Sequence, residues 1–478
     1  MTAIHYNDWL EANQQYLHEA IAGLREYLGH HLQDNEITGE EGDQPVHAVK
    51  ERRLPDHEIN PPATLQTLCN TFSLSEFERD LILICAGVEL DSGFASLIAA
   101  LQSKPQPASP TFGLILSLLP SAHWSALTPD APLRRWRMIE LGIGNGFTTS
   151  PLSIDERVLH YLTGVSQMDA RLSGLIRPLS MSPNIPGSHN VIAERMVTAW
   201  AGDKRVTERP VIQLCARNME DIRAVAARAC YQAGVGLFAI DARDIPANAA
   251  ERDALARLWE RESALESVIL LVECDDTTKI ANVVSFASNM SAASIFSSRE
   301  PLPLPGQRLL RLDVPQAEPA EQITLWHHAL GSSAKRLNGQ IQRLVSQFNL
   351  GADAIYAASA QVMNDGAGLS DEDMGVRLWE TCRYSARQRL DELAQRIEPI
   401  ATWQDLVLPE AQLQALHHIV VHVRQRSLVY DTWGFRSKSA RGLGISVLFS
   451  GVSGTGKTMA SEVLANELNL DLYRIDLS

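Results

Sequence analysis

Residues 451–458 carry the clearest chemistry in the chain, because they match the phosphate-binding pattern G-x-x-x-x-G-K-[ST]. Glycines let the backbone curl so that successive N–H groups point at phosphate oxygens. A lysine supplies a point charge for the β- and γ-phosphates, and a threonine hydroxyl helps to ligate Mg²⁺. The spacing therefore predicts a site for ATP and Mg²⁺, with Thr458 as the protein's magnesium ligand. The predicted nucleotide-binding residues are Gly451, Val452, Ser453, Gly454, Thr455, Gly456, Lys457, Thr458 and Met459.

The flanks of this loop have the pattern that phosphate binding requires. An apolar strand is predicted over 445–450 and a helix over 458–468, so the loop would lie at a helix N-terminus. The alternative is an ordinary strand–turn–helix with an accidental lysine. A chance match in a chain of this length is on the order of one in a hundred. Nucleotide binding is the favoured interpretation.

Residues 447–478 resemble the first strands of an AAA+ ATPase module. The resemblance implies that the catalytic acid and base, the sensor and the arginine finger are expected beyond Ser478, so no catalytic residue is assigned. The chain alone is then expected to hydrolyse ATP poorly and to bind it weakly. By the same resemblance, Tyr430 to Phe435 would line the adenine pocket; the alternative is an aromatic cluster that packs a linker.

A second, altered copy of this plan is predicted from residue 210. Apolar strands at 211–214, 236–241, 268–272, 294–297 and 309–314 alternate with helices at 219–233 and 252–265, which predicts a parallel, helix-covered sheet. Asp241 follows Cys215 by 26 residues, and Asp476 follows Gly451 by 25 residues. Residues 215–221 contain no glycine and no lysine, and two acidic residues at the helix start would repel phosphate.

The third strand of this copy supports the same interpretation. Glu273 stands where an AAA+ module has its metal-side acid, but Cys274 replaces the catalytic base, and a thiol polarises water poorly at neutral pH. Residues 210 to about 395 are therefore interpreted as a non-catalytic AAA+-like module with a helical lid; the alternative is an unrelated α/β domain. As a whole, residues 190–478 resemble bacterial AAA-family ATPases with a helical or winged-helix front, some of which accompany contractile injection systems.

The front of the chain is predicted to be mostly helical. Helices are expected at 5–34, 64–72, 75–90, 109–119 and 132–141, followed by an extended piece at 147–152, an order that resembles a winged helix. The helix at 75–90 is predicted to open with a capping box formed by Ser75 and Glu78. Winged helices bind DNA or dock proteins. The formal net charge of −15 favours docking, because duplex binding draws on Lys and Arg that neutralise phosphates.

These patterns combine into an α/β multidomain fold class. The predicted domains are a winged-helix-like domain at 1–190, a degenerate AAA+-like module at 191–340, its helical lid at 341–398 and the start of a P-loop AAA+ module at 399–478. Neither a secretory signal nor a membrane-spanning run is evident, and six scattered cysteines suggest reduced core thiols. A cytoplasmic location is expected.

Three functions remain open at the level of sequence. The leading one is an ATPase that couples hydrolysis to remodelling or assembly of a protein client, as a homo-oligomeric ring. The second is a nucleotide-dependent switch or scaffold that binds protein partners. The third is a DNA-binding regulator, which the negative charge disfavours. No membrane partner is expected. The helix predicted over 410–430 carries His417, His418 and His422, which are interpreted as an interface cluster and not as a metal site.

Overall fold

The computed structural model describes residues 3–37, 55, 59–102, 109–144, 146–180, 184–201, 210–275, 279–304, 306, 308–365, 370–387, 394–426, 428–435 and 444–475. Contacts divide the chain into two compact units. The first comprises residues 1–179, 197–213 and 230–311, and the second comprises residues 180–196, 214–229 and 312–478.

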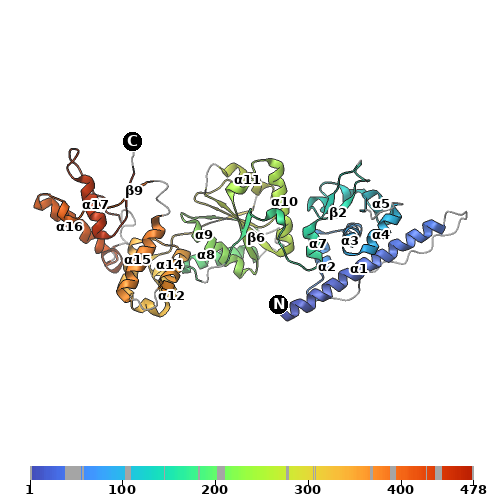
Figure 1. Ribbon diagram of the computed structural model, residues 1–478, viewed down its shortest axis with the longest axis horizontal. Coiled ribbons are helices and arrows are strands. Elements are labelled where there is room, and N and C mark those ends of the chain that lie inside the picture. Colours follow the sequence, from blue (N-terminus) through green and yellow to red (C-terminus); the bar gives the residue numbers. More distant parts are fainter. Residues whose placement is uncertain are drawn as a thin grey trace. The chain divides into compact units, whose positions relative to one another are not determined.

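The first unit begins with a helical domain built around one buried helix. Helix α3 (Glu76–Leu90) is buried from Phe77 to Gly87, and α1 lies against both α3 and α4 (Figure 1). The predicted capping box is confirmed: Ser75 caps the helix, and the Glu78 carboxylate accepts the Ser75 backbone N–H at 2.8 Å. The other helices of this domain are α1 (Ala3–Ile37), α2 (Thr64–Phe72), α4 (Ser92–Leu101), α5 (Phe112–Leu118), α6 (Pro132–Arg135) and α7 (Glu156–Leu162).

A two-stranded hairpin completes the helical domain and corrects one prediction. The helix predicted over 132–141 ends at Arg135, and β1 (Ile139–Leu141) pairs antiparallel with β2 (Leu152–Ile154). Arg137 has a φ of 48°, so the chain turns out of the helix before β1. Pairing with a strand eleven residues further along the chain outweighs the local helical pattern, because Ile139, Leu152 and Ile154 then all become buried.

A six-stranded sheet follows the helical domain, and five of its strands match the predicted alternation of strands and helices. The spatial order is β3-β5-β6-β7-β4-β8, in which β5–β6 and β6–β7 are parallel. An unpredicted short strand, β3, adds antiparallel to β5 at one edge. The strands are β3 (Ile176–Pro178), β4 (Val211–Cys215), β5 (Gly236–Asp241), β6 (Val268–Cys274), β7 (Ser294–Ser298) and β8 (Leu309–Asp313). Helices α8 (Gly187–Ala201), α9 (Met219–Gln232), α10 (Ala249–Glu266) and α11 (Ile280–Ser288) connect them.

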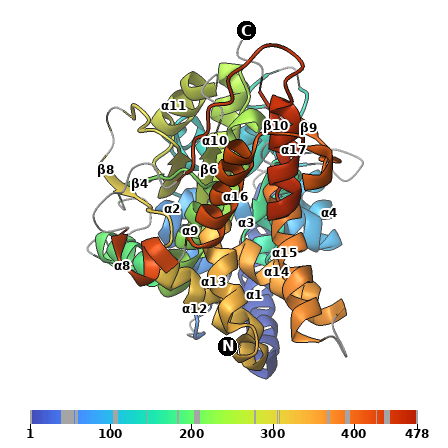
Figure 2. The ribbon, with the colours of Figure 1, turned by 90° about the vertical axis from the view of Figure 1, so that its left-hand side faces the viewer.

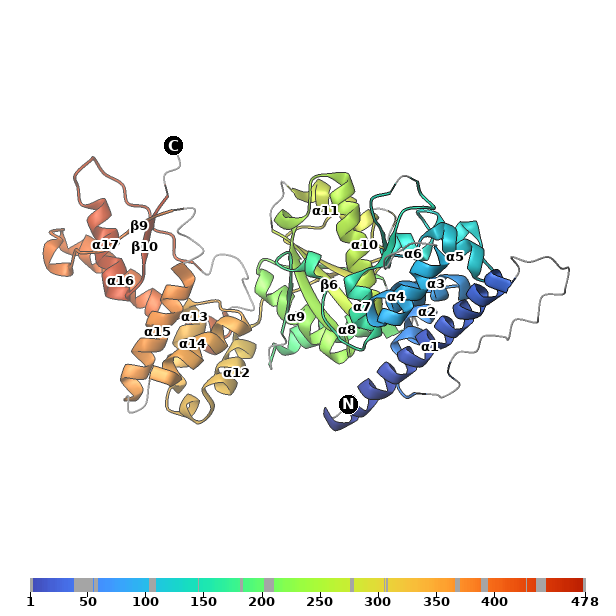
Figure 3. The same ribbon diagram turned by 45° about the vertical axis from the view of Figure 1, so that its right-hand side comes forward.

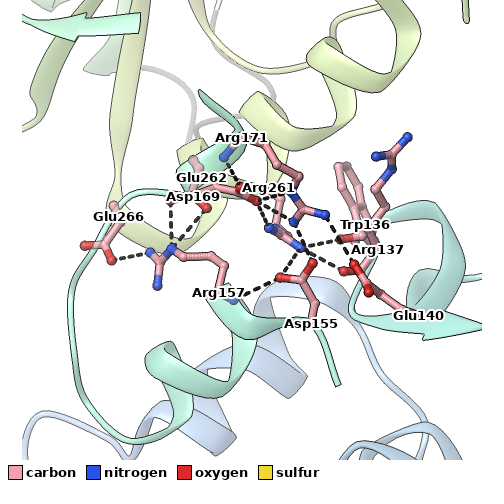
Figure 4. Close-up of polar contacts among 10 residues, drawn as sticks. All are labelled: Trp136, Arg137, Glu140, Asp155, Arg157, Asp169, Arg171, Arg261, Glu262 and Glu266. Atoms are coloured by element: carbon pink, nitrogen blue, oxygen red, sulfur yellow. Dashed lines mark hydrogen bonds and ion pairs between the residues drawn. The ribbon is translucent and has the colours of Figure 1, made fainter. Parts of the chain in front are cut away.

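Buried ion pairs join the helical domain to α10 within the first unit (Figure 4). Arg157 Nε lies 3.0 Å from Glu262 Oε2, and Arg261 NH2 lies 2.5 Å from Asp169 Oδ2. Arg261 and Glu262 are completely buried, and Arg261 NH1 also donates to the Arg137 carbonyl at 2.8 Å. Because these groups have left water, each charge depends on its partners. The domain and the sheet are therefore linked by contacts about a hundred residues apart in sequence.

The second unit contains a four-helix domain with its own core. Helices α12 (Pro319–Leu330), α13 (Asn338–Gln347), α14 (Ala352–Asp365) and α15 (Asp371–Arg387) pack together (Figure 3) around Trp326, Ile341, Ile355 and Leu378. The helical pattern predicted up to 397 ends earlier, since β9 (Gln395–Ile397) is a strand.

The last part of the second unit pairs its strands differently from the prediction. Helix α16 (Glu410–Arg424) continues into a π-helical turn (Leu428–Thr432) and lies beside α17 (Lys457–Leu468) (Figure 2). Strand β10 (Leu472–Arg474) pairs antiparallel with β9. The strand predicted over 445–450 does not form: this segment has no ladder partner among the described residues, and Leu448 is 90% exposed.

The segment 445–450 has no described strand beside it, whereas β4 of the six-stranded sheet is flanked by β7 and β8. A strand gains its ladder hydrogen bonds from such neighbours. An apolar run alone therefore does not make a strand.

No single described helix is long and apolar enough to cross a bilayer; α3 and α4 pass that test only as a pair that bends by 118°. The six cysteines, all within the described residues, form no disulfide.

Candidate nucleotide-binding site

The phosphate-binding loop forms a tight turn whose conformation depends on glycine. Gly454 and Gly456 have φ values of 84° and 83°, in the left-handed region that side chains disfavour, and Gly451 has a φ of 154°. The Thr455 hydroxyl donates to the Val452 carbonyl at 2.9 Å and braces the turn. Gly456 then caps helix α17. The loop thus delivers the unpaired N–H groups of a twelve-residue helix to one place.

Lys457 is folded over the loop that precedes it. Its ammonium donates to the carbonyl oxygens of Gly451 at 3.0 Å and of Val452 at 2.8 Å. The Lys457 ammonium therefore lies against the backbone of the turn. In this position the ammonium is ready to exchange carbonyl oxygens for phosphate oxygens, which are stronger acceptors because they are charged.

The loop is open to solvent, so no packed side chain fills the place where phosphate would lie. Residues 451–455 and Thr458 are exposed, and Met459 in the first turn of α17 is 39% exposed. The helix behind the loop is anchored, because Ala460 and Val463 are buried against Leu406 and Leu416. A fixed helix with an exposed tip is the arrangement an anion site needs.

A carboxylate at the far end of α17 ties this helix to its neighbours. The Trp403 indole N–H donates to Glu467 Oε2 at 2.9 Å, and Arg424 NH2 lies 2.6 Å from Glu467 Oε1. The Trp403 ring also stacks on His417, with ring centroids 4.0 Å apart, so His417 serves packing. Among the described residues no cluster of three potential metal ligands occurs.

This carboxylate gives the segment a pH dependence. The hydrogen bond from Trp403, together with Arg424, holds the pKa of Glu467 below its ordinary value. A lowered carboxylate pKa stabilises the fold above the unfolded-state pKa of about 4.3, and this stabilisation is lost as the pH falls through the folded-state pKa. We expect Glu467→Gln to flatten the acid side of a Tm-versus-pH profile below about pH 5. Glu398→Gln, at an exposed position of the same segment, should leave the profile unchanged; equal flattening in both variants would contradict the assignment.

Residues 430–435, predicted to line the adenine pocket, contribute to a cavity that the phosphate-binding loop does not line. Tyr430 and Gly434 line a cavity of about 860 Å³ together with the start of α12, Gln322 and Arg426. No residue of the phosphate-binding loop lines this cavity. An adenine role for Tyr430–Phe435 stays a prediction.

In the predicted earlier copy, the groups compared with catalytic ones lie in protein contacts. Glu273, predicted to stand at the place of a metal-side acid, is buried and pairs with Arg177 of β3, with NH2 2.7 Å from Oε2. Cys274 is buried beside it at the end of β6. The Arg177 guanidinium neutralises the Glu273 carboxylate charge that a metal ion would otherwise neutralise. This pairing was not visible in the sequence, because β3 was not predicted.

The helix start of the earlier copy is also covered. A Cβ placed on Gly351, just before α14, would lie 3.0 Å from Asp221 Oδ1 and 3.1 Å from Asn218 Nδ2. The lid backbone thus packs on the N-terminus of α9, where the later copy has its open loop. Acidic side chains and a covering backbone both disfavour a triphosphate there.

Two family models match the chain. A model described as "Winged helix domain, variant" matches residues 12–176, and one described as "Contractile injection system ATPase helical domain" matches residues 318–388. Each model matches one part of the chain, a winged-helix domain at the front and the helical domain of an ATPase further on. The predicted fold class is confirmed, with a winged-helix front, an α/β module and a helical domain. The second match coincides with α12–α15.

A solved structure titled "Structure of Rhizobiales Trip13" aligns at 13% identity, over 40% of this chain and 84% of that chain, with a TM-score of 0.25. No curated protein matches the chain.

Proposed function

We propose that this protein is an ATP-binding AAA+ ATPase that couples hydrolysis to remodelling or assembly of a protein client. The observation that carries the proposal is the loop 451–458, an exposed turn of left-handed glycines at the tip of an anchored helix, with one lysine folded over it. The match of residues 318–388 to the helical domain of a contractile injection system ATPase supports the same activity.

In this proposal the two α/β copies have different tasks. The later copy binds magnesium nucleotide through residues 451–459, with Thr458 toward the metal. The earlier copy, with Glu273 paired to Arg177, is structural. The winged-helix domain recruits protein, and the chain works as a homo-oligomeric ring in the cytoplasm, in keeping with six cysteines that form no disulfide.

Nucleotide titration of the whole chain tests the proposal. We expect saturable binding of a fluorescent ATP analogue that requires Mg²⁺ and that ATP and ADP displace much better than AMP does. The physical reason is that the loop's N–H groups and Lys457 act on the β- and γ-phosphates. Binding that is indifferent to Mg²⁺, or equal competition by AMP, would show that the loop does not recognise phosphates in this way.

A further inference from the structure

The loop of the winged-helix hairpin has the wrong composition for holding DNA. Residues 141–150, which connect β1 to β2, contain no lysine and no arginine. Instead, Ile143 is completely exposed, at 103% of its reference area, and Phe147 is 37% exposed. We propose that the wing patch, comprising Trp124, Arg134, Arg135, Ile143 and Phe147, docks an acidic segment of a partner protein that carries aromatic or aliphatic side chains.

The hairpin holds Ile143 in a fixed position. A Cβ on Gly142 would lie 2.7 Å from Pro151 Cγ, and one on Gly144 would lie 2.5 Å from Ser150 Oγ. Glycine on both sides of Ile143 therefore lets the two arms of the hairpin approach closely. The Ser150 hydroxyl donates to the Gly146 carbonyl at 2.7 Å and closes the turn. A side chain displayed on a braced turn loses little entropy when a partner covers it.

Aromatic rings extend the apolar surface beside the hairpin. Phe147 stacks on the buried Phe112 with ring centroids 5.2 Å apart, and Trp124 lies 6.2 Å from Phe147 on the other side. Trp124 is 59% exposed. Rigid aromatic side chains in this state are typical anchors of protein interfaces, where they gain burial at low conformational cost.

The charge of the patch selects the partner. The Arg134 guanidinium lies 5.3 Å from the Phe147 ring centroid and is held by a hydrogen bond from NH1 to the Leu127 carbonyl at 3.1 Å. The exposed Arg135 lies 5.1 Å from the Trp136 ring centroid. Each guanidinium has five N–H donors, so both retain donors for a carboxylate. On a chain of net charge −15, two arginines over aromatic rings favour an acidic, apolar peptide.

Panning a random peptide library displayed on phage against the whole chain tests this surface. We expect the enriched peptides to combine Asp or Glu with Trp, Phe or Leu. A synthetic peptide of the enriched sequence should bind at least about tenfold more weakly to Ile143→Asp and to Arg135→Glu. The carboxylate introduced by Ile143→Asp would face the apolar side chains of the peptide, and the carboxylate introduced by Arg135→Glu would repel its acidic side chains. The fully exposed position of Ile143 means that this variant keeps its fold.

Leu90→Asp provides the control, since Leu90 is 46% exposed on the same domain but outside the wing patch. Its peptide affinity should equal that of the wild type. The proposal is overturned if no acidic–apolar sequence is enriched, or if the selected peptides bind Ile143→Asp normally. The proposal is also overturned if Ile143→Asp abolishes binding of an oligothymidylate probe, which would indicate a nucleic-acid surface. A third contradicting result is that Ile143→Asp abolishes only self-association in sedimentation, which would indicate that the patch binds a second copy of this chain.

Discussion

Arg261→Met should lower the free energy of unfolding of the first unit by about 3–5 kcal/mol, the usual cost of removing one partner from a buried ion pair. Arg261 is completely buried and lies within 3.1 Å of Asp155 Oδ1 and 2.5 Å of Asp169 Oδ2. Burial lowers the pKa of Arg261 and raises the pKa of Glu262, the directions expected where desolvation disfavours both charged forms. Without Arg261, two buried carboxylates lose a counter-charge.

Urea unfolding followed by tryptophan fluorescence measures this effect, because Trp136 and Trp259 lie in the two parts that the ion pairs join. Arg243→Ala is the matched control: Arg243 also pairs with an aspartate, but it is 71% exposed, so its loss should cost at most about 1 kcal/mol. If charge is the cause, adding Asp169→Asn to Arg261→Met should recover part of the loss. A double variant that is simply the sum of both single losses would mean that Arg261 acts through packing alone.

Lys457→Ala should weaken binding of magnesium ATP by about 10- to 100-fold, since a hydrogen bond to a charged group contributes about 1.5–3 kcal/mol. The ammonium already lies against the loop, at the Gly451 and Val452 carbonyls, so no rearrangement of the helix is needed for it to reach phosphate. Any release of phosphate by the wild type should disappear in this variant. Titration with a fluorescent ATP analogue measures the affinity.

Two further variants separate a local role of Lys457 from a general loss of positive charge. Lys335→Ala removes an exposed lysine of the same unit and should leave the affinity unchanged. Lys457→Arg keeps the charge but replaces a compact ammonium by a planar fork, so it should restore only part of the affinity. Affinity that is equal in the wild type and in Lys457→Ala would remove the lysine from the site and, with it, the main support for the ATPase proposal.

Local patterns predicted much of the fold. The strands β4 and β6 were found because they are buried along their whole length, which leaves short, largely apolar runs. The capping box at Ser75 and Glu78 was found because its partners are three residues apart. The predictions failed where pairing between distant segments decides the structure. The segment 445–450 has a strand's composition but no ladder neighbour among the described residues, and the region 136–141 has a helical pattern but gains burial by pairing with β2.

By itself, the sequence determined the phosphate-binding pattern at 451–458 and the absence of glycine and lysine at 215–221, because both depend on the identity and spacing of adjacent residues. Only the tertiary structure decided which groups meet across the chain. It paired Glu273 with Arg177, buried Arg261 between Asp155 and Asp169, and left Ile143 uncovered. The physical reason is that charge pairing and desolvation act at a few ångströms in space, whereas the residues concerned are about 90 to 105 positions apart in the chain.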